Sequence, residues 1–196
     1  MIAYQRSIKS AYEIEMTKKV SKISSEAHKF VMRKARPGMT EFHCRELFKL
    51  YCGLNGATHE AYSSICGAGK GAATLHYIVN DKIAKDGDLI LNDMGSRANG
   101  YVADITCTFP VNGKFTEKQK DIYNIVLKAN RDCEAMLKPG TPMKSVHEKS
   151  CSSLAEGLIE LGLLKCDLET AIKQVKNSNL CQFFSIFLQF FNFFEY

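Results

Sequence analysis

Two apolar runs near the middle of the chain, residues 88–94 and 101–109, constrain the fold more than any other feature. Their alternating side chains and the turn-forming residues between them predict an antiparallel β-hairpin. Asp88 begins the first run, and each run carries one aspartate inside it among apolar residues, Asp93 in the first and Asp104 in the second. A buried carboxylate costs several kcal/mol unless a partner compensates its charge. Neither run contains a lysine or an arginine. We therefore expect a group outside the two runs to compensate the charges of Asp93 and Asp104.

Two turns are compatible with this hairpin, and each sets a different register. With Ala98-Asn99 at the turn, Asp93 lies directly opposite Asp104, with Cβ atoms about 4.5–5.5 Å apart. With Asn99-Gly100 at the turn, Asp93 lies opposite Thr106 and diagonal to Asp104, about 7–8 Å away. In both registers the two carboxylates share one face of the hairpin, because cross-strand partners share a face.

Three interpretations of the aspartate pair remain open at this point. A divalent cation between the carboxylates would remove their repulsion, and oxygen ligands at this separation suit Mn²⁺, Co²⁺, Zn²⁺ or Mg²⁺. The pair could instead share a proton as an acid and a base, or both residues could be hydrogen-bonded at strand ends without a functional role. A metal would need further His or Glu ligands. His76, in a strand-like segment upstream, either faces the same cleft or is a structural histidine.

The remaining pattern predicts helices and strands in separate stretches, the α+β class. Two short β-leaning segments, 61–69 and 73–80, precede the hairpin. Pro-Gly pairs at 37–38 and 139–140 each join a long helix to a second one, which makes a weak internal repeat. Apolar residues at helical spacing predict four helices, within residues 17–38, 40–56, 116–140 and 141–162.

Composition narrows the class of partners. The chain of 196 residues is 45% hydrophobic and 24% charged, which is typical of a globular domain. Its net charge of +5 is spread along helical stretches beside acidic residues, so we expect no nucleic-acid partner. The eight cysteines form no CxxC pair, and we expect no signal peptide at the N-terminus. Free thiols in the cytoplasm are therefore expected.

The end of the chain differs from the rest. Residues 180–196 hold seven of the twelve phenylalanines. The segment is too short and too interrupted by polar residues to predict a membrane span, and it lacks the basic face of a membrane-surface helix. We therefore expect residues 179–196 to be a tail that does not belong to the fold, and we expect no membrane partner.

The motifs around the two aspartates resemble the pita-bread metallopeptidases, which include methionine aminopeptidases, aminopeptidase P and prolidase. NDMG at 92–95 and ADIT at 103–106 place the aspartates eleven residues apart, like the first two metal ligands of that family. Among these, the sequence is most similar to prolidase, the Xaa-Pro dipeptidase. The similar segments are KISSEAHKFVM, SSICGAG, LHY, ADITCTFPVNGKFTEKQKDIY and LKPG. The similarity runs from about Thr17 to about Gly162.

The resemblance implies an incomplete pita-bread fold, a curved antiparallel sheet with helices packed on one face. It implies a centre of two divalent metal ions, Mn²⁺ in prolidase, in which Asp93 chelates one ion and Asp104 bridges both. His76 and Ile65 would contact the substrate, a dipeptide with C-terminal proline, and no residue of this chain is assigned a catalytic role. A homodimer is a further implication, and residues 1–178 would form a partial catalytic domain.

The departures from the family suggest what this chain can do alone. No segment matches the HGxGH-type motif or the two glutamate motifs that supply the remaining ligands in the family. We therefore expect the isolated chain to be inactive in Xaa-Pro dipeptide hydrolysis. Two alternatives remain open: a non-catalytic fragment that acts through protein–protein interaction, and a peptidase similar to aminopeptidase P.

Overall fold

The structure is a computed structural model that describes residues 4 and 7–178. The tail predicted over residues 179–196 lies outside these described residues. The chain divides between Lys114 and Phe115 into two compact units, each with its own hydrophobic core. Within the described part of the chain, no helix combines the length and apolar character that a membrane span requires.

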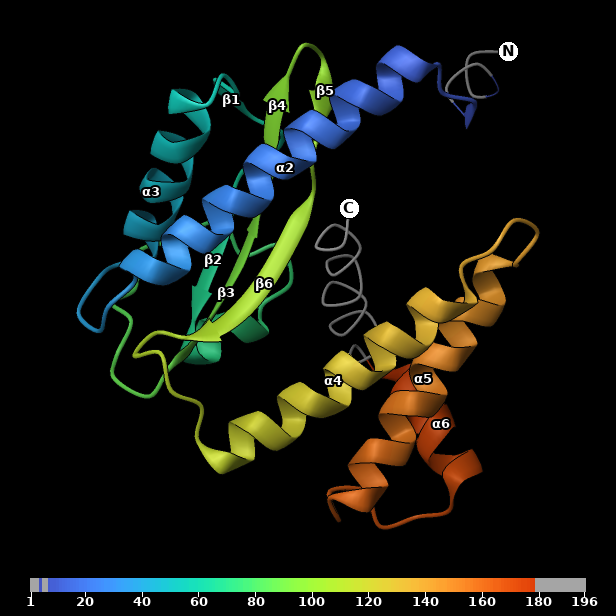
Figure 1. The fold of residues 1–196 in the computed structure, drawn as a ribbon. Coiled ribbons are helices and arrows are strands. Elements are labelled where there is room, and N and C mark those ends of the chain that lie inside the picture. The colour runs from blue at the N-terminus through green and yellow to red at the C-terminus, as the bar shows by residue number, and fades with distance from the viewer. Residues whose placement is uncertain (1–3, 5–6, 179–196) are drawn as a thin grey trace. The chain divides into compact units, whose positions relative to one another are not determined.

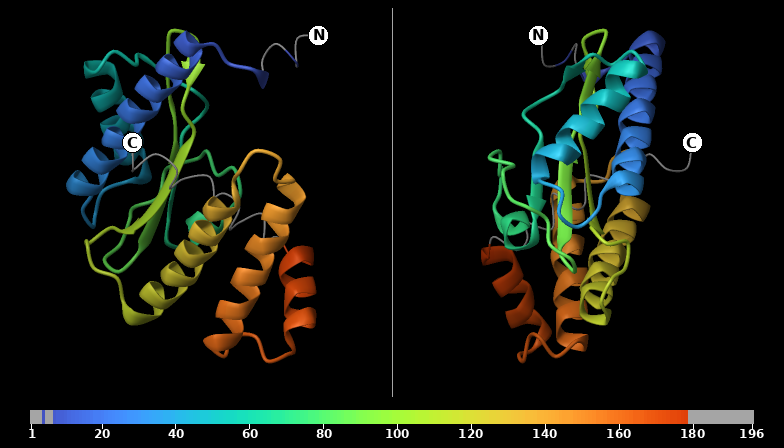
Figure 2. Two further views of the ribbon diagram at one scale, coloured as in Figure 1. Left: turned by 45° about the vertical axis from the view of Figure 1, so that its right-hand side comes forward. Right: turned by 90° about the vertical axis from the view of Figure 1, so that its left-hand side faces the viewer.

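The first unit combines two helices with antiparallel strands (Figure 1). Its helices pack against one face of the sheet (Figure 2). Fully buried side chains such as Phe48 from the second helix and Ile90 and Met94 from the sheet fill the space between them. The elements in chain order are α2 (Ala11–Lys34), α3 (Glu41–Leu54), β1 (His59–Glu60), β2 (Ile65–Ala68), the short 3₁₀ helix η1 (Gly69–Ala73), β3 (Leu89–Met94), β4 (Ser96–Ala98), β5 (Tyr101–Val102) and β6 (Ile105–Pro110).

The predicted hairpin is present, and its register is the second of the two alternatives. The strands pair in the orders β2-β3-β6 and β1-β4-β5, antiparallel throughout. Ala98 pairs with Tyr101, which places Asn99-Gly100 at the turn, and Asp93 lies opposite Thr106. Both turn residues have a positive φ, 51° and 83°. Glycine adopts this conformation freely and asparagine tolerates it, which favours the turn.

The β-leaning segments upstream are shorter than predicted. The strand expected over 61–69 covers only Ile65–Ala68, and 73–80 contains no strand. Gly69, His76 and Asn80 have left-handed backbones, with φ of 53°, 52° and 55°. Such residues break an extended strand, so this stretch forms η1 and then a loop.

The second unit is a set of three helices, α4 (Glu117–Met136), α5 (Met143–Glu160) and α6 (Leu168–Asn177). Thr116 and Gln119 form the capping box that their spacing predicted at the start of α4. Leu154 and Val175 are completely buried between the helices. Both Pro-Gly connections turn at their glycine, Gly38 with φ 91° and Gly140 with φ 90°, so the two helix pairs are joined alike.

Candidate metal centre

One tyrosine hydroxyl joins the two aspartates of the hairpin. Tyr62 Oη donates to Asp93 Oδ1 at 2.5 Å and to Asp104 Oδ1 at 3.0 Å. The two carboxylate oxygens can therefore be no farther apart than the sum of these distances. Both side chains lie on the same face, as alternation along the strands required. No lysine or arginine forms an ion pair with either aspartate within the described residues.

A close backbone approach holds Tyr62 in place. The Ala61 N–H donates to Gly95 O at 2.8 Å, which ties the segment before β2 to the hairpin. A Cβ added at Gly95 would lie 1.9 Å from Ala103 O and 3.0 Å from the Tyr62 ring. Only glycine fits there. The glycine of the 92–95 motif thus allows Tyr62 to reach both carboxylates.

The electrostatics of the site keep its tyrosine a hydrogen-bond donor. Burial, followed by the charges of Asp93 and Asp104, raises the pKa of Tyr62 far above its usual range. Burial also raises the pKa of the half-buried Asp93, and the charge of Asp104 adds to this effect. The hydrogen bond from Tyr62 opposes these two effects and lowers the pKa of Asp93. Asp104 itself is exposed.

The structure places the two predicted substrate-side residues at different depths. Ile65 pairs directly with Asp93 across β2 and β3 and is 7% exposed, so it lies on the same face as the carboxylates. His76 is exposed in the loop after η1, and its charge lowers the pKa of Asp93. The strand expected around His76 is absent, so its position depends on the loop.

The donor set fits part of a divalent metal centre. Two carboxylates on one face, which no lysine or arginine of the described chain pairs with, offer the hard oxygen ligands that Mn²⁺, Mg²⁺ or Zn²⁺ accept. Among the residues that the structure describes, no cluster of three or more His, Cys, Asp or Glu side chains could hold a metal ion. The described chain thus presents two ligands, which is fewer than a closed site needs.

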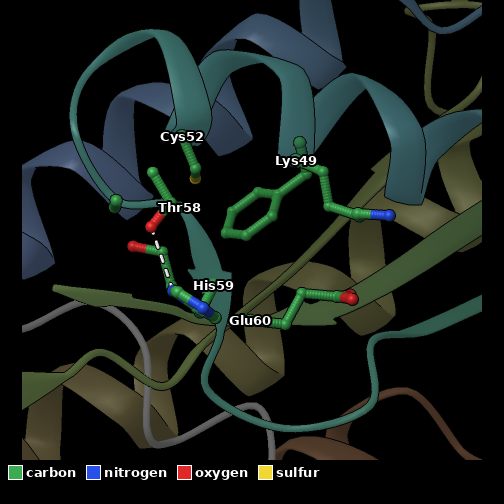
Figure 3. A pocket seen from close by; sticks show the side chains of 8 residues that line it. Lys49, Cys52, Thr58, His59 and Glu60 are labelled. Atoms are coloured by element: carbon green, nitrogen blue, oxygen red, sulfur yellow. Dashed lines mark hydrogen bonds between the residues drawn. The ribbon is translucent and has the colours of Figure 1, made fainter. Parts of the chain in front are cut away.

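A separate groove in the first unit does not coincide with this centre. It has a volume of about 290 Å³, and its lining residues include Phe48, Cys52 and Ala57 (Figure 3). At its rim the Thr58 hydroxyl and His59 Nδ1 are hydrogen-bonded at 2.9 Å. Neither aspartate of the hairpin lines it.

Sequence reasoning did not find Tyr62. It lies three residues before β2 in an irregular stretch, where alternation gives no facing direction. Its role depends on the close contact with Gly95, which is 33 residues away along the chain. The signal available in the sequence was Gly95, two residues after Asp93, because a glycine that interrupts an extended run often marks a close approach of another group.

Comparison with known proteins identifies the family of this chain. The chain matches Metallopeptidase family M24 over residues 15–181, and it belongs to that family. The resemblance read from the motifs is therefore confirmed at the level of the family.

Individual relatives include two kinds of peptidase. The chain is 44% identical over 173 residues to a protein of Podospora anserina named a probable Xaa-Pro aminopeptidase. It is 39% identical over 173 residues to the Xaa-Pro dipeptidase of Mus musculus. These alignments cover 88% and 86% of this chain but 37% and 35% of the relatives, so the chain spans little more than a third of their length.

Solved structures confirm the expected fold. A Zn-substituted Escherichia coli aminopeptidase P in complex with product aligns with a TM-score of 0.85 and 38% identity. The alignment covers 88% of this chain and 39% of that chain. The antiparallel sheet with helices on one face is thus the corresponding part of a pita-bread fold, in the α+β class predicted from the sequence.

Proposed function

We propose that this chain supplies Asp93 and Asp104 as two ligands of a divalent metal centre that hydrolyses Xaa-Pro peptides. The observation that carries the proposal is the Tyr62 hydroxyl, which lies within hydrogen-bond distance of both carboxylates. Two acids thus gather around one point, and no described lysine or arginine forms an ion pair with either of them. Membership of Metallopeptidase family M24 supports a peptidase reaction.

Each residue has a proposed part. Asp93 and Asp104 would be ligands of the metal ions, and Tyr62 would orient both carboxylates through its single hydroxyl. Ile65 forms an apolar wall beside Asp93, and His76 contacts the substrate from the loop. A divalent metal held there would supply Lewis-acid polarisation of the peptide carbonyl. We propose Mn²⁺ as that metal.

The substrate proposed is a dipeptide with C-terminal proline. The motifs are most similar to prolidase, and a mouse Xaa-Pro dipeptidase is among the relatives. An aminopeptidase P-like specificity for longer peptides is the second candidate. It is favoured by the identity to the Podospora anserina protein and by the aminopeptidase P structure.

We also propose that the isolated chain is inactive, because its described residues present only two ligands. In that case the chain acts through protein–protein interaction, for which a homodimer is the simplest arrangement. The domain proposed is residues 1–178 as a partial catalytic domain, without residues 179–196. Free thiols at Cys44, Cys52, Cys66, Cys107 and Cys166 support a cytoplasmic location.

Metal binding and activity test these statements separately. Titration with Mn²⁺ should show binding that is weakened in Asp93→Asn and Asp104→Asn but not in Asp121→Asn, an exposed control on α4. Binding that is equal in all three variants would disprove the site. In an assay with the dipeptide Gly-Pro, the isolated chain should give no turnover. Turnover that vanishes in Asp93→Ala would overturn the proposed inactivity and confirm the ligand.

A further inference from the structure

The loop that carries His76 is held by an unusual number of side-chain contacts. It runs from the end of β2 through η1 to residue 83 and contains no strand. Exposed loops of this length are ordinarily mobile. Here both ends and the middle of the loop meet the same buried carboxylate.

That carboxylate belongs to Glu41, the first residue of α3, whose exposed fraction is 0%. Its Oε1 accepts the Ala68 N–H at 2.7 Å, where β2 passes into the loop. Its Oε2 accepts the Tyr77 hydroxyl at 2.8 Å and the Lys82 N–H at 3.0 Å. Three donors converge on two oxygens, and the N-terminus of α3 adds a favourable dipole. Glu41 therefore joins the start, the middle and the end of the loop.

Backbone hydrogen bonds close the base of the loop at the same place. The Glu41 N–H donates to Lys82 O at 2.8 Å, and Ala84 N–H donates to Met39 O at 2.8 Å. Thr40 and Ile83 form a β-bridge between these bonds. The segment before α3 is thus paired with the segment before β3, so α3 and the loop hold each other.

Asn80 makes a second anchor. Its side chain is 5% exposed and forms hydrogen bonds with backbone groups at the start of β2, as a neighbouring strand would. Asn80 Oδ1 accepts the Cys66 N–H at 2.7 Å, and Nδ2 donates to Ser64 O at 2.8 Å. Its own backbone is left-handed, with φ of 55°. These bonds compensate that conformation and fix the loop four residues after His76.

His76 itself lies between the anchors in a conformation that a free loop would avoid. Its φ of 52° is left-handed, and its side chain is exposed. Residues in such conformations persist where the surrounding structure determines them, and they gather at functional sites. The next residue, Tyr77, is 8% exposed and bonded to Glu41.

We infer that Glu41, acting through Tyr77 and with Asn80, is a positioning residue that fixes the loop at His76. The inference rests on the proposed function in one respect, the contact of His76 with substrate. Glu41 is on a helix outside the aspartate hairpin and touches neither carboxylate of the candidate metal centre. Its effect on the reaction would pass entirely through the loop.

Two substitutions test the inference on the full chain without metal. Glu41→Gln keeps the shape but replaces one acceptor oxygen by an amide that faces donors, and Tyr77→Phe removes only the hydroxyl. Glu46→Gln and Tyr51→Phe are matched controls on the same helix, since Glu46 is partly exposed and Tyr51 is half-buried. Amide hydrogen exchange of Ala68 and Lys82 should accelerate by roughly tenfold or more in the test variants only.

The exchange in Leu89–Met94 and Ile105–Pro110 distinguishes positioning from general stability. These strands should exchange at wild-type rates in Tyr77→Phe. Equal acceleration in strands and loop, or no acceleration in the loop, would overturn the inference. Tyr77→Phe gives a decision even where Glu41→Gln does not fold.

A second readout reports on His76 directly. With paramagnetic Mn²⁺ added, the NMR relaxation rates of the His76 imidazole protons should rise strongly in the wild type and in both controls. Their relaxation should weaken in Tyr77→Phe while the affinity for Mn²⁺ stays the same. Wild-type relaxation in that variant would overturn the inference. If the wild-type chain binds no Mn²⁺, the proposed function fails, while metal-free exchange and the line shape of the His76 signals still decide the inference.

Discussion

Acid should destabilise the first unit through one buried histidine. His28 on α2 is 1% exposed and is hydrogen-bonded at both ring nitrogens. Nε2 donates to Met94 O at 3.0 Å, which leaves Nδ1 to accept from the Cys107 thiol at 3.1 Å. Burial raises the pKa of that thiol, so it remains a donor. This arrangement suits the neutral ring.

Burial lowers the pKa of His28 to about 4, from 6.5 in an unfolded chain. The folded state therefore resists protonation, whereas the unfolded state gains a proton as the pH falls below 6.5. The stabilising contribution is complete above pH 6.5 and is lost progressively as the pH falls toward 4. At about 1.4 kcal/mol per pH unit, the loss reaches about 3 kcal/mol at pH 4.

Urea unfolding followed by far-UV circular dichroism measures this loss, since the chain has no tryptophan. Acidic residues also titrate in this range, so the wild type is compared with His28→Gln at each pH. The difference in the free energy of unfolding between them should shrink by about 3 kcal/mol from pH 7 to pH 4. The exposed His59→Asn should follow the wild type. A difference that does not change with pH would refute a neutral buried His28.

Three further substitutions, two of them paired with a control substitution, have defined outcomes. Gly95→Ala should destabilise the hairpin by more than about 2 kcal/mol in urea unfolding, since its Cβ would meet backbone. Gly53→Ala in α3, where a Cβ meets nothing, should be neutral or slightly stabilising. Tyr62→Phe should weaken Mn²⁺ binding by calorimetry roughly tenfold, because it removes the group that orients both ligands, and Tyr51→Phe should not. Gly157→Ala should lower the melting temperature of the second unit, since a Cβ would lie 2.6 Å from a neighbouring isoleucine.

Local signals account for what the sequence could predict. Helix starts were visible because caps are local, as at Thr116 and Gln119. Alternation placed Asp93 and Asp104 on one face, since the face to which a side chain points follows from the residue order within its own strand. The register was not determined by alternation, because two adjacent turns were both chemically acceptable. The left-handed backbone at Asn99 and Gly100 decided between them.

What escaped prediction depends on contacts between distant segments. An acidic residue in the first turn of a helix is the usual complement of the helix dipole at an exposed position, and Glu41 fits that pattern. Nothing nearby in the sequence indicates that its carboxylate is fully buried or that it accepts from Ala68 and Lys82. The same reason explains the error over residues 73–80, where an apolar composition predicted a strand. A loop can be as ordered as a strand when side chains from distant segments supply its hydrogen bonds. The residue pattern of the loop itself then does not indicate these bonds.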